Sequence, residues 1–301
     1  MDTNEYLQKI LESQTLSTDS GELKDLQKHR ADIEEVLRKK FSESSPTIRY
    51  GGSKAKGTMI RESYDLDIIC YFPHDDKAAG ETLKDVYNNV YKSLSERYLV
   101  EPKSSALRIK DRDPKNYNVD FHIDVVPGRY TDDSRKDAYL YQASGEKERL
   151  KTNLDIHIKH IKESGFTDAI RLFKLWKVRN GLRVKTFALE LLTIESLKGS
   201  RLSNLSLQLE YVWERLRDDI KEISIEDPAN PQGNDLSDLL SPAIQLELSS
   251  VATKTLEAIQ NSGWEAVFGP VEGESKDKKS DALRRAVVSV TTPTKPWFDD
   301  L

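Results

Sequence analysis

Residues 49–72 of the chain read RYGGSKAKGTMIRESYDLDIICYF. Two adjacent glycines are followed by a serine and two lysines, and two aspartates stand one residue apart at the start of an apolar run. Glycine permits backbone conformations that other residues avoid, and it lets a ligand approach the main chain closely. The stretch therefore predicts a tight turn, a short helical turn, and then a strand that begins at the two carboxylates.

Asp65 and Asp67 are expected on the same face of this strand, because successive side chains alternate between the two faces. Two neighbouring carboxylates repel each other and resist burial. Such a pair is most often a solvated strand end, and it is also stable where a cation lies between the two groups. Mg²⁺ prefers oxygen ligands, typically one or two carboxylates together with substrate phosphates. The pair is therefore a candidate metal site.

A second strand carries further polar residues at every other position. In NVDFHIDVVP, residues 118–127, Asp120, His122 and Asp124 alternate with apolar residues. If the two strands pair, one of these aspartates completes a cluster of three carboxylates. The spacing does not choose between Asp120 and Asp124, and a solvated strand face is the alternative for both. His122 is the weaker ligand candidate because Mg²⁺ prefers oxygen to nitrogen.

The glycine–serine turn is a candidate phosphate site. Ser53 can cap a helical turn over residues 53–59, whose first amides then point toward a ligand. A phosphate placed there meets N–H donors, the Ser53 hydroxyl and the positive charge of Lys54 or Lys56. A simple tight turn is the alternative, and the nearby aspartates favour the phosphate interpretation.

Composition limits the class of partner. The chain has 301 residues, a charged fraction of 32% and a formal net charge of −5. A stable grip on duplex nucleic acid requires a basic face, which this balance argues against. The single cysteine, Cys70, excludes a disulfide within the chain and a zinc ribbon. The sequence shows neither a signal peptide nor an apolar membrane span, so we expect a cytoplasmic protein.

The pattern of apolar residues divides the chain into two parts. Strands are predicted over residues 47–50, 65–72, 106–110 and 117–126. Helices are predicted over residues 2–13, 23–41 and 80–98, and then over 154–163, 166–179, 186–197, 202–220 and 236–259. We therefore expect terminal helices and a sheet-containing core in residues 1–150 and a helical lobe in 151–270. Residues 271–301 are predicted to be a flexible linker and tail, because they begin with a charged run that lacks apolar periodicity.

The motif GGSKAKGTMIRESYDLD, residues 51–67, resembles the signature of the DNA polymerase β-like nucleotidyltransferases. Its form is most similar to the branch that contains the oligoadenylate synthetases, cyclic GMP–AMP synthase and the bacterial cGAS/DncV-like nucleotidyltransferases (CD-NTases). In this family the third carboxylate stands in a strand written D-h-V-P. Here that segment is Asp124-Val125-Val126-Pro127, so the resemblance assigns Asp124 rather than Asp120.

Four further segments extend the resemblance to about residue 235. TNLDIHIKHI (152–161) resembles the T-x-x-x-x-H segment that opens the family's helical lobe, and EDPANPQGND (226–235) resembles its D-P-x-[ND]-P-x-N-[ND] segment. IRLFKLWKVRN (170–180) and VKTFALELLTIESL (184–197) are similar to the K-x-W and A-L-E-L-L-T pattern of the oligoadenylate synthetases. The resemblance implies an α+β fold: a polymerase β-like core with a mixed, mainly antiparallel sheet and helices, plus a helical lobe, with the active site in the cleft between them.

The resemblance also implies roles for individual residues. It assigns catalysis and the binding of Mg²⁺, with Mn²⁺ as an alternative, to Asp65, Asp67 and Asp124. It assigns nucleotide binding to Gly52, Ser53, Lys174, Lys185, Thr186 and Phe187, in which Lys174 and Thr186 contact the donor phosphates and Phe187 stacks on the donor base. Glu190 is expected to hold its helix in the core.

By resemblance, the chain joins nucleoside triphosphates, ATP among them, into a cyclic di- or trinucleotide second messenger for bacterial anti-phage (CBASS) signalling. A separate effector would bind the product, and a regulatory protein partner would dock on the C-terminal tail at Trp297 and Phe298. One alternative is a synthase of linear 2′–5′ oligonucleotides, or an enzyme that modifies an RNA or protein acceptor. The other is a nucleotide-binding regulator that has lost catalysis, against which the intact set of three aspartates argues.

Overall fold

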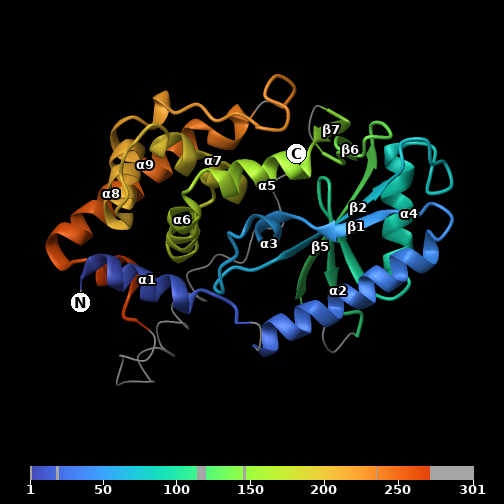
Figure 1. Cartoon of the computed structure of the whole chain (residues 1–301), viewed down its shortest axis with the longest axis horizontal. Coiled ribbons are helices and arrows are strands. Elements are labelled where there is room, and N and C mark those ends of the chain that lie inside the picture. The colour runs from blue at the N-terminus through green and yellow to red at the C-terminus, as the bar shows by residue number, and fades with distance from the viewer. Residues whose placement is uncertain (1, 18–19, 114–119, 145–146, 235, 272–301) are drawn as a thin grey trace.

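The computed structural model describes residues 2–17, 20–113, 120–144, 147–234 and 236–271 (Figure 1). A lobe built on a β-sheet lies beside a lobe built of helices, and the short helix α3 (Gly52–Lys56) lies where they meet (Figure 1). The predicted tail, including Trp297 and Phe298, lies outside the described residues. No helix in the described ranges has both the length and the apolar character needed to cross a membrane.

The sheet is mixed and mainly antiparallel. Its strands are β1 (Thr47–Tyr50), β2 (Leu66–Phe72), β3 (Leu99–Pro102), β4 (Leu107–Lys110), β5 (Asp120–Tyr130), β6 (Ala138–Tyr141) and β7 (Arg149–Thr152). Five of them follow the order β1-β2-β5-β4-β3, while β6 pairs with the far end of β5, and β7 pairs with β6. The β2–β5 pair is parallel, and the other described pairs are antiparallel. This arrangement confirms the predicted fold class.

Alternation along β2 separates the face that helices cover from a second face. On β2, Leu66, Ile68, Cys70 and Phe72 are buried in a cluster with apolar residues of two helices, α2 (Gly21–Lys40) and α4 (Leu83–Ser95). Because neighbouring residues point to opposite faces, Asp67 lies on the second face, away from these helices. Further along β2 this second face carries a smaller apolar cluster that buries Ile69 and Tyr71, so the polar groups are confined to the start of the strand.

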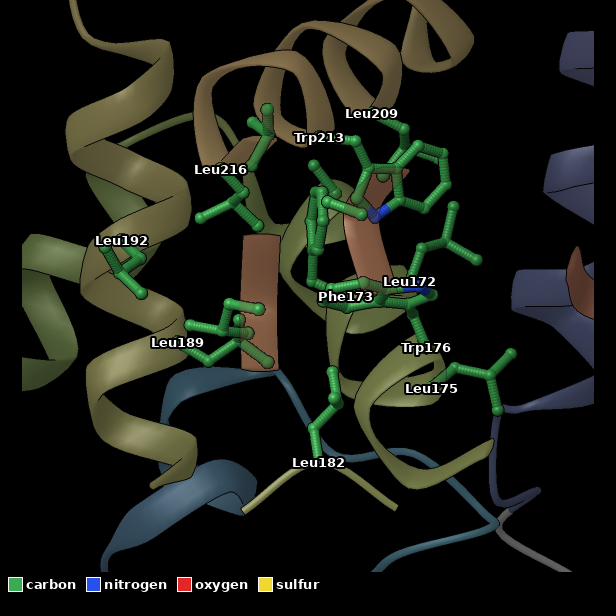
Figure 2. Packing of buried hydrophobic residues seen from close by; sticks show 14 of the residues in the cluster. Leu172, Phe173, Leu175, Trp176, Leu182, Leu189, Leu192, Leu209, Trp213 and Leu216 are labelled. Carbon is green, nitrogen blue, oxygen red and sulfur yellow. The ribbon is translucent and has the colours of Figure 1, made fainter. Parts of the chain in front are cut away.

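The helical lobe is organised around two tryptophans. Its helices are α5 (Leu154–Glu163), α6 (Thr167–Arg179), α7 (Thr186–Leu197), α8 (Leu205–Asp218), α9 (Pro242–Ser262) and α10 (Glu265–Phe268), with 3₁₀ turns η2 (Ile220–Glu222) and η3 (Ser237–Leu240). Figure 2 shows Trp176 and Phe173 of α6 against Trp213 of α8, and all three are fully buried. The indole N–H of Trp176 donates to Thr255 Oγ1 at 2.9 Å, which satisfies its one polar atom. The first helix of the chain, α1 (Thr3–Ser13), belongs to the same cluster.

The structure also departs from the sequence-based expectations. The strands over residues 99–102, 138–141 and 149–152 were not predicted, because alternation over four residues is a weak signal, although the equally short strand over 47–50 was predicted. The predicted helix over 236–259 instead begins at Pro242, which suits the first turn of a helix. The division of the chain at residue 150 stays a prediction.

The turn after β1 brings the main chain onto the side chain of Asp67. Gly51 donates its N–H to the Asp67 carbonyl at 2.7 Å. Gly52 has a φ of +48°, and a Cβ atom added there would overlap Asp67 Oδ2. Glycine is therefore required at position 52 twice, for its left-handed conformation and for the space that Asp67 occupies.

We expect Gly52→Ala to lower the free energy of unfolding by about 3 kcal/mol or more, through backbone strain and this overlap. Gly57→Ala is the matched control, because Gly57 has a φ of +78° but open space around its Cβ position. The control should cost only about 1–2 kcal/mol, the usual price of a left-handed alanine. Urea denaturation of both variants measures the difference, and equal losses would contradict the close approach to Asp67.

Candidate active site

The sheet brings the three predicted carboxylates together. In the parallel β2–β5 pair, Asp67 lies directly opposite Asp124. Asp65 immediately precedes β2, and one guanidinium contacts both Asp65 and Asp124. The structure thus gathers Asp65, Asp67 and Asp124 on the second face of the sheet, at the start of β2.

Two cations that the sequence analysis did not single out lie among these carboxylates. Arg108, on β4, is paired in register with Asp124. Its Nε donates to Asp124 Oδ1 at 2.6 Å, and its Nη2 donates to Asp124 Oδ2 at 2.9 Å and to Asp65 Oδ2 at 2.8 Å. Lys103, in the β3–β4 turn, donates to Asp124 Oδ2 at 2.9 Å. The predicted strand over 106–110 contained Arg108, but its pairing partner could not be known without the strand order.

The three carboxylates differ in how their charge is compensated. Burial, and then the negative charges of Asp124 and Asp65, raise the pKa of Asp67 to about 6. Burial alone would also raise the pKa of Asp65, but the hydrogen bond from His122 and the charge of Arg108 outweigh it and lower that pKa. Asp67 therefore carries an electrostatic penalty that a further cation at this site would relieve.

His122 reaches the site through an irregularity in β5. The β4–β5 register shifts between Ile109 and Lys110, and His122 has a φ of +55°. Its Nδ1 lies 3.4 Å from Asp65 Oδ1. The simple alternation expected through residues 120–124 is therefore interrupted by a bulge, a feature that often re-aims a side chain beside an active site.

The predicted phosphate turn is helical, but Ser53 does not cap it. The helical turn predicted over 53–59 is the shorter helix α3, which ends at Lys56; its N-cap residue is Gly51, it has no side-chain cap, and Ser53 lies inside its first turn. Ser53 is half-buried on it and Lys54 is exposed. The Lys56 ammonium is paired with the carboxylate of Glu190 on α7. Lys56 therefore joins the two lobes.

Lys174 also lies at the junction of the lobes. Its side chain on α6 is buried, and its Nζ donates to the Thr58 carbonyl at 2.6 Å. Burial lowers the pKa of Lys174 to about 8, although the nearby Glu190 carboxylate opposes the shift. Glu190 is fully buried and accepts a hydrogen bond from Thr58 Oγ1 at 2.7 Å. It thus lies in the core, as predicted, and also links α7 to the segment after the turn.

The remaining predicted residues lie at the start of α7. Lys185 is the exposed N-cap residue, and Thr186 and Phe187 are half-buried. Lys56 Nζ lies 5.4 Å from the centroid of the Phe187 ring. Phe187 thereby contacts the phosphate turn. Among the described residues, no contact places Lys185 in the site.

The chain was compared with known families and structures. The Second Messenger Oligonucleotide or Dinucleotide Synthetase domain family (SMODS) matches residues 1–164. The comparison with curated proteins found no match.

Several solved structures share the fold. The complex of CdnC with HORMA-deltaN from E. coli MS115-1 is 20% identical, with a TM-score of 0.64 over 89% of this chain and 97% of that one. The CdnE cyclic dinucleotide synthase of Elizabethkingia meningoseptica with GTP and Apcpp is 16% identical, with a TM-score of 0.60 over 84% and 98%. The DncV cyclic AMP-GMP synthase of Vibrio cholerae with nonhydrolyzable GTP is 17% identical, with a TM-score of 0.58 over 90% and 86%.

The family match covers more than half of the chain, and the solved structures show the same two-lobed arrangement over most of it. The resemblance inferred from the glycine–serine turn and the aspartates is confirmed. The chain belongs to the SMODS family and is a nucleotidyltransferase of the bacterial cGAS/DncV-like group.

Proposed function

We propose that this protein joins nucleoside triphosphates, ATP among them, into a cyclic di- or trinucleotide and releases pyrophosphate. The observation that carries the proposal is the in-register pairing of Asp67 with Asp124, with Asp65 beside them, on the second face of the sheet. The family description and the cyclic dinucleotide synthases among the structural relatives support it.

The carboxylates fit a divalent cation by their chemistry. The site supplies oxygen ligands, and burial, followed by the negative charges of Asp124 and Asp65, raises the pKa of Asp67. In the described part of the chain, however, no three His, Cys, Asp or Glu side chains converge tightly enough to hold a metal ion as they stand. The Arg108 guanidinium contacts two of the three carboxylates, so binding of an ion requires these side chains to rearrange.

Asp65, Asp67 and Asp124 would hold Mg²⁺, with Mn²⁺ as an alternative. When bound, such an ion neutralises charge on the triphosphate and makes the acceptor hydroxyl more acidic. The protein's own part is to position the two nucleotides, because phosphoryl transfer depends mainly on alignment and charge neutralisation.

In the proposed reaction, a 2′- or 3′-hydroxyl oxygen attacks the α-phosphorus of a bound triphosphate. The new P–O bond forms as the bond to the β-phosphate oxygen breaks, and pyrophosphate leaves. Asp124 accepts the proton of the hydroxyl. Gly52, Ser53, Lys174 and Thr186 bind the donor phosphates with help from Lys185, and Phe187 stacks on the donor base.

We further propose that the product is a signal in bacterial anti-phage (CBASS) defence, bound by a separate effector in the cytoplasm. The occurrence of CdnC in a complex with HORMA-deltaN supports a regulatory protein partner for this chain as well. Synthesis of linear 2′–5′ oligonucleotides and transfer to an RNA or protein acceptor are the alternatives within the same chemistry. A lapsed nucleotide-binding regulator is the alternative outside it.

Incubation of the purified chain with all four ribonucleoside triphosphates and Mg²⁺ should give pyrophosphate and a short product that resists phosphatase. Mass spectrometry and nuclease digestion then give its ring size and linkage. The variant Asp65→Ala/Asp67→Ala is the control and should give no product. A phosphatase-sensitive product indicates a linear synthase. Equal triphosphate consumption by wild type and variant, in the presence of any divalent metal, would contradict the assignment of the carboxylates.

The charge imbalance at Asp67 predicts that its removal stabilises the metal-free protein. The folded-state pKa of about 6 exceeds the ordinary value of 3.8, so the folded state loses stability as the pH rises through this interval and bears the full penalty above pH 6. At pH 7.5 without divalent metal, we expect Asp67→Asn to raise the free energy of unfolding by on the order of 1–3 kcal/mol. This gain should vanish near pH 4.

Asp65→Asn is the matched control for this measurement. The pKa of Asp65 is lowered, so its charge stabilises the folded state above pH 4, and the substitution should lower stability at pH 7.5. Denaturant melts with EDTA present check both signs. Destabilisation of similar size in both variants would show that Asp67 bears no excess charge.

A further inference from the structure

Two segments that are far apart in the sequence meet beside Phe187. His157 lies in the first turns of α5, and Asp227 lies in the loop between η2 and η3. His157 Nε2 is 2.7 Å from Asp227 Oδ1. The centroid of the His157 ring is 5.0 Å from that of Phe187, and the two rings are tilted by 54°. A chain of contacts therefore runs from the 226–235 loop to the aromatic ring at the start of α7.

Asp227 is buried, and both of its carboxylate oxygens accept hydrogen bonds. The residue is 3% exposed, and three groups in all donate to its two oxygens. Oδ1 accepts from the Ala229 N–H at 2.8 Å as well as from His157, and Oδ2 accepts from Asn234 Nδ2 at 2.5 Å. Asn234 Nδ2 also donates to the Lys151 carbonyl at 3.0 Å, which ties the loop to β7.

These hydrogen bonds define the state of the histidine. Burial alone would raise the pKa of Asp227, but the hydrogen bonds from His157 and Asn234 outweigh it and lower that pKa. An ionised carboxylate only accepts hydrogen bonds, so His157 donates through Nε2. Asp227 consequently holds the His157 ring at Nε2, and the ring contacts Phe187.

Phe187 needs such support for the role that its position suggests. It lies in the first turn of α7 and is half-buried, so one part of its ring packs against the apolar core of the helical lobe and another part remains accessible. An aromatic ring that must meet a nucleobase in one orientation loses less entropy on binding if neighbours already hold it. Besides the core, the His157 ring and Lys56 Nζ contact the Phe187 ring.

We propose that His157 is a positioning residue for the donor nucleobase: with Asp227 and Asn234 behind it, it holds the Phe187 ring in the orientation that stacks on the base. The inference rests on the proposed function, because it takes Phe187 as the stacking residue. The ligand part concerned is the base and not the triphosphate, whose binding is assigned above to groups on α3, α6 and the start of α7. The two parts can therefore be tested separately.

The test compares the affinity for a non-hydrolysable α,β-methylene analogue of each of the four ribonucleoside triphosphates with the affinity for inorganic tripolyphosphate, by calorimetry on the full chain with Mg²⁺. For the analogue that binds the wild type most tightly, His157→Ala should weaken binding roughly five- to tenfold, a part of the stacking energy of one base. Tripolyphosphate binding should be unchanged. Asp227→Asn, which acts on Phe187 only through His157, should give a smaller loss of the same kind.

Three controls make the result specific. His160→Ala changes the other histidine of α5, one turn further along, and should leave both affinities unchanged. Phe187→Ala should reproduce the selective loss. The double variant His157→Ala/Phe187→Ala should lose no more than Phe187→Ala alone, because both substitutions remove one platform.

Equal losses for nucleotide and tripolyphosphate would overturn the proposal, since they would show that the histidine merely supports the fold. Additive losses in the double variant would overturn it too, and so would a selective loss in Phe187→Ala that neither His157→Ala nor Asp227→Asn shows. If Phe187→Ala itself binds nucleotide normally, the assigned base site fails together with this inference. Product formation by the wild type then still decides whether the proposed reaction holds.

Discussion

The parallel pairing of β2 with β5 is the constraint on which the rest of the molecule depends. It places Asp67 opposite Asp124 and holds two carboxylates side by side at one end of a sheet face. The opposite face carries Leu66, Ile68 and their neighbours under α2 and α4, which fixes the register. A shift by one residue would turn the carboxylates into this apolar cluster, so the geometry of the site and the stability of the sheet are specified together.

Buried polar contacts join the second lobe to this sheet, beside apolar contacts such as that of Leu154 with the sheet. Glu190, in the interior of α7, contacts both Lys56 and Thr58, and Lys174 reaches the same segment from α6. A buried carboxylate without partners is costly, so Glu190 is stable only when the turn segment is in place. These polar contacts thus hold the phosphate turn and the residues after it against α6 and α7.

Part of this arrangement was predictable from the sequence. The helix over residues 186–197 and the strand over 47–50 agree with the structure at both ends. Asp65 and Asp67 were found from their spacing, whereas Asp124 was chosen over Asp120 only by the resemblance to the nucleotidyltransferases. Arg108 and Lys103 were missed for a physical reason: a single cation on a short strand has meaning only through the partner that strand pairing gives it. The bulge that turns His122 toward Asp65 likewise depends on the register of β4 with β5.

The packing of α1 has a consequence for the order in which the protein folds. Tyr6, Leu7, Ile10 and Leu11 are buried against helices of the second lobe, and the Tyr6 hydroxyl donates to the Gly269 carbonyl at 2.6 Å. These residues are synthesised before the sheet lobe, and their partners are synthesised after it. The apolar side chains of α1 therefore lack their partners while the sheet lobe is made, and closure over such a long sequence separation is slow. Completion of the second lobe is consequently the event that buries both ends of the described chain.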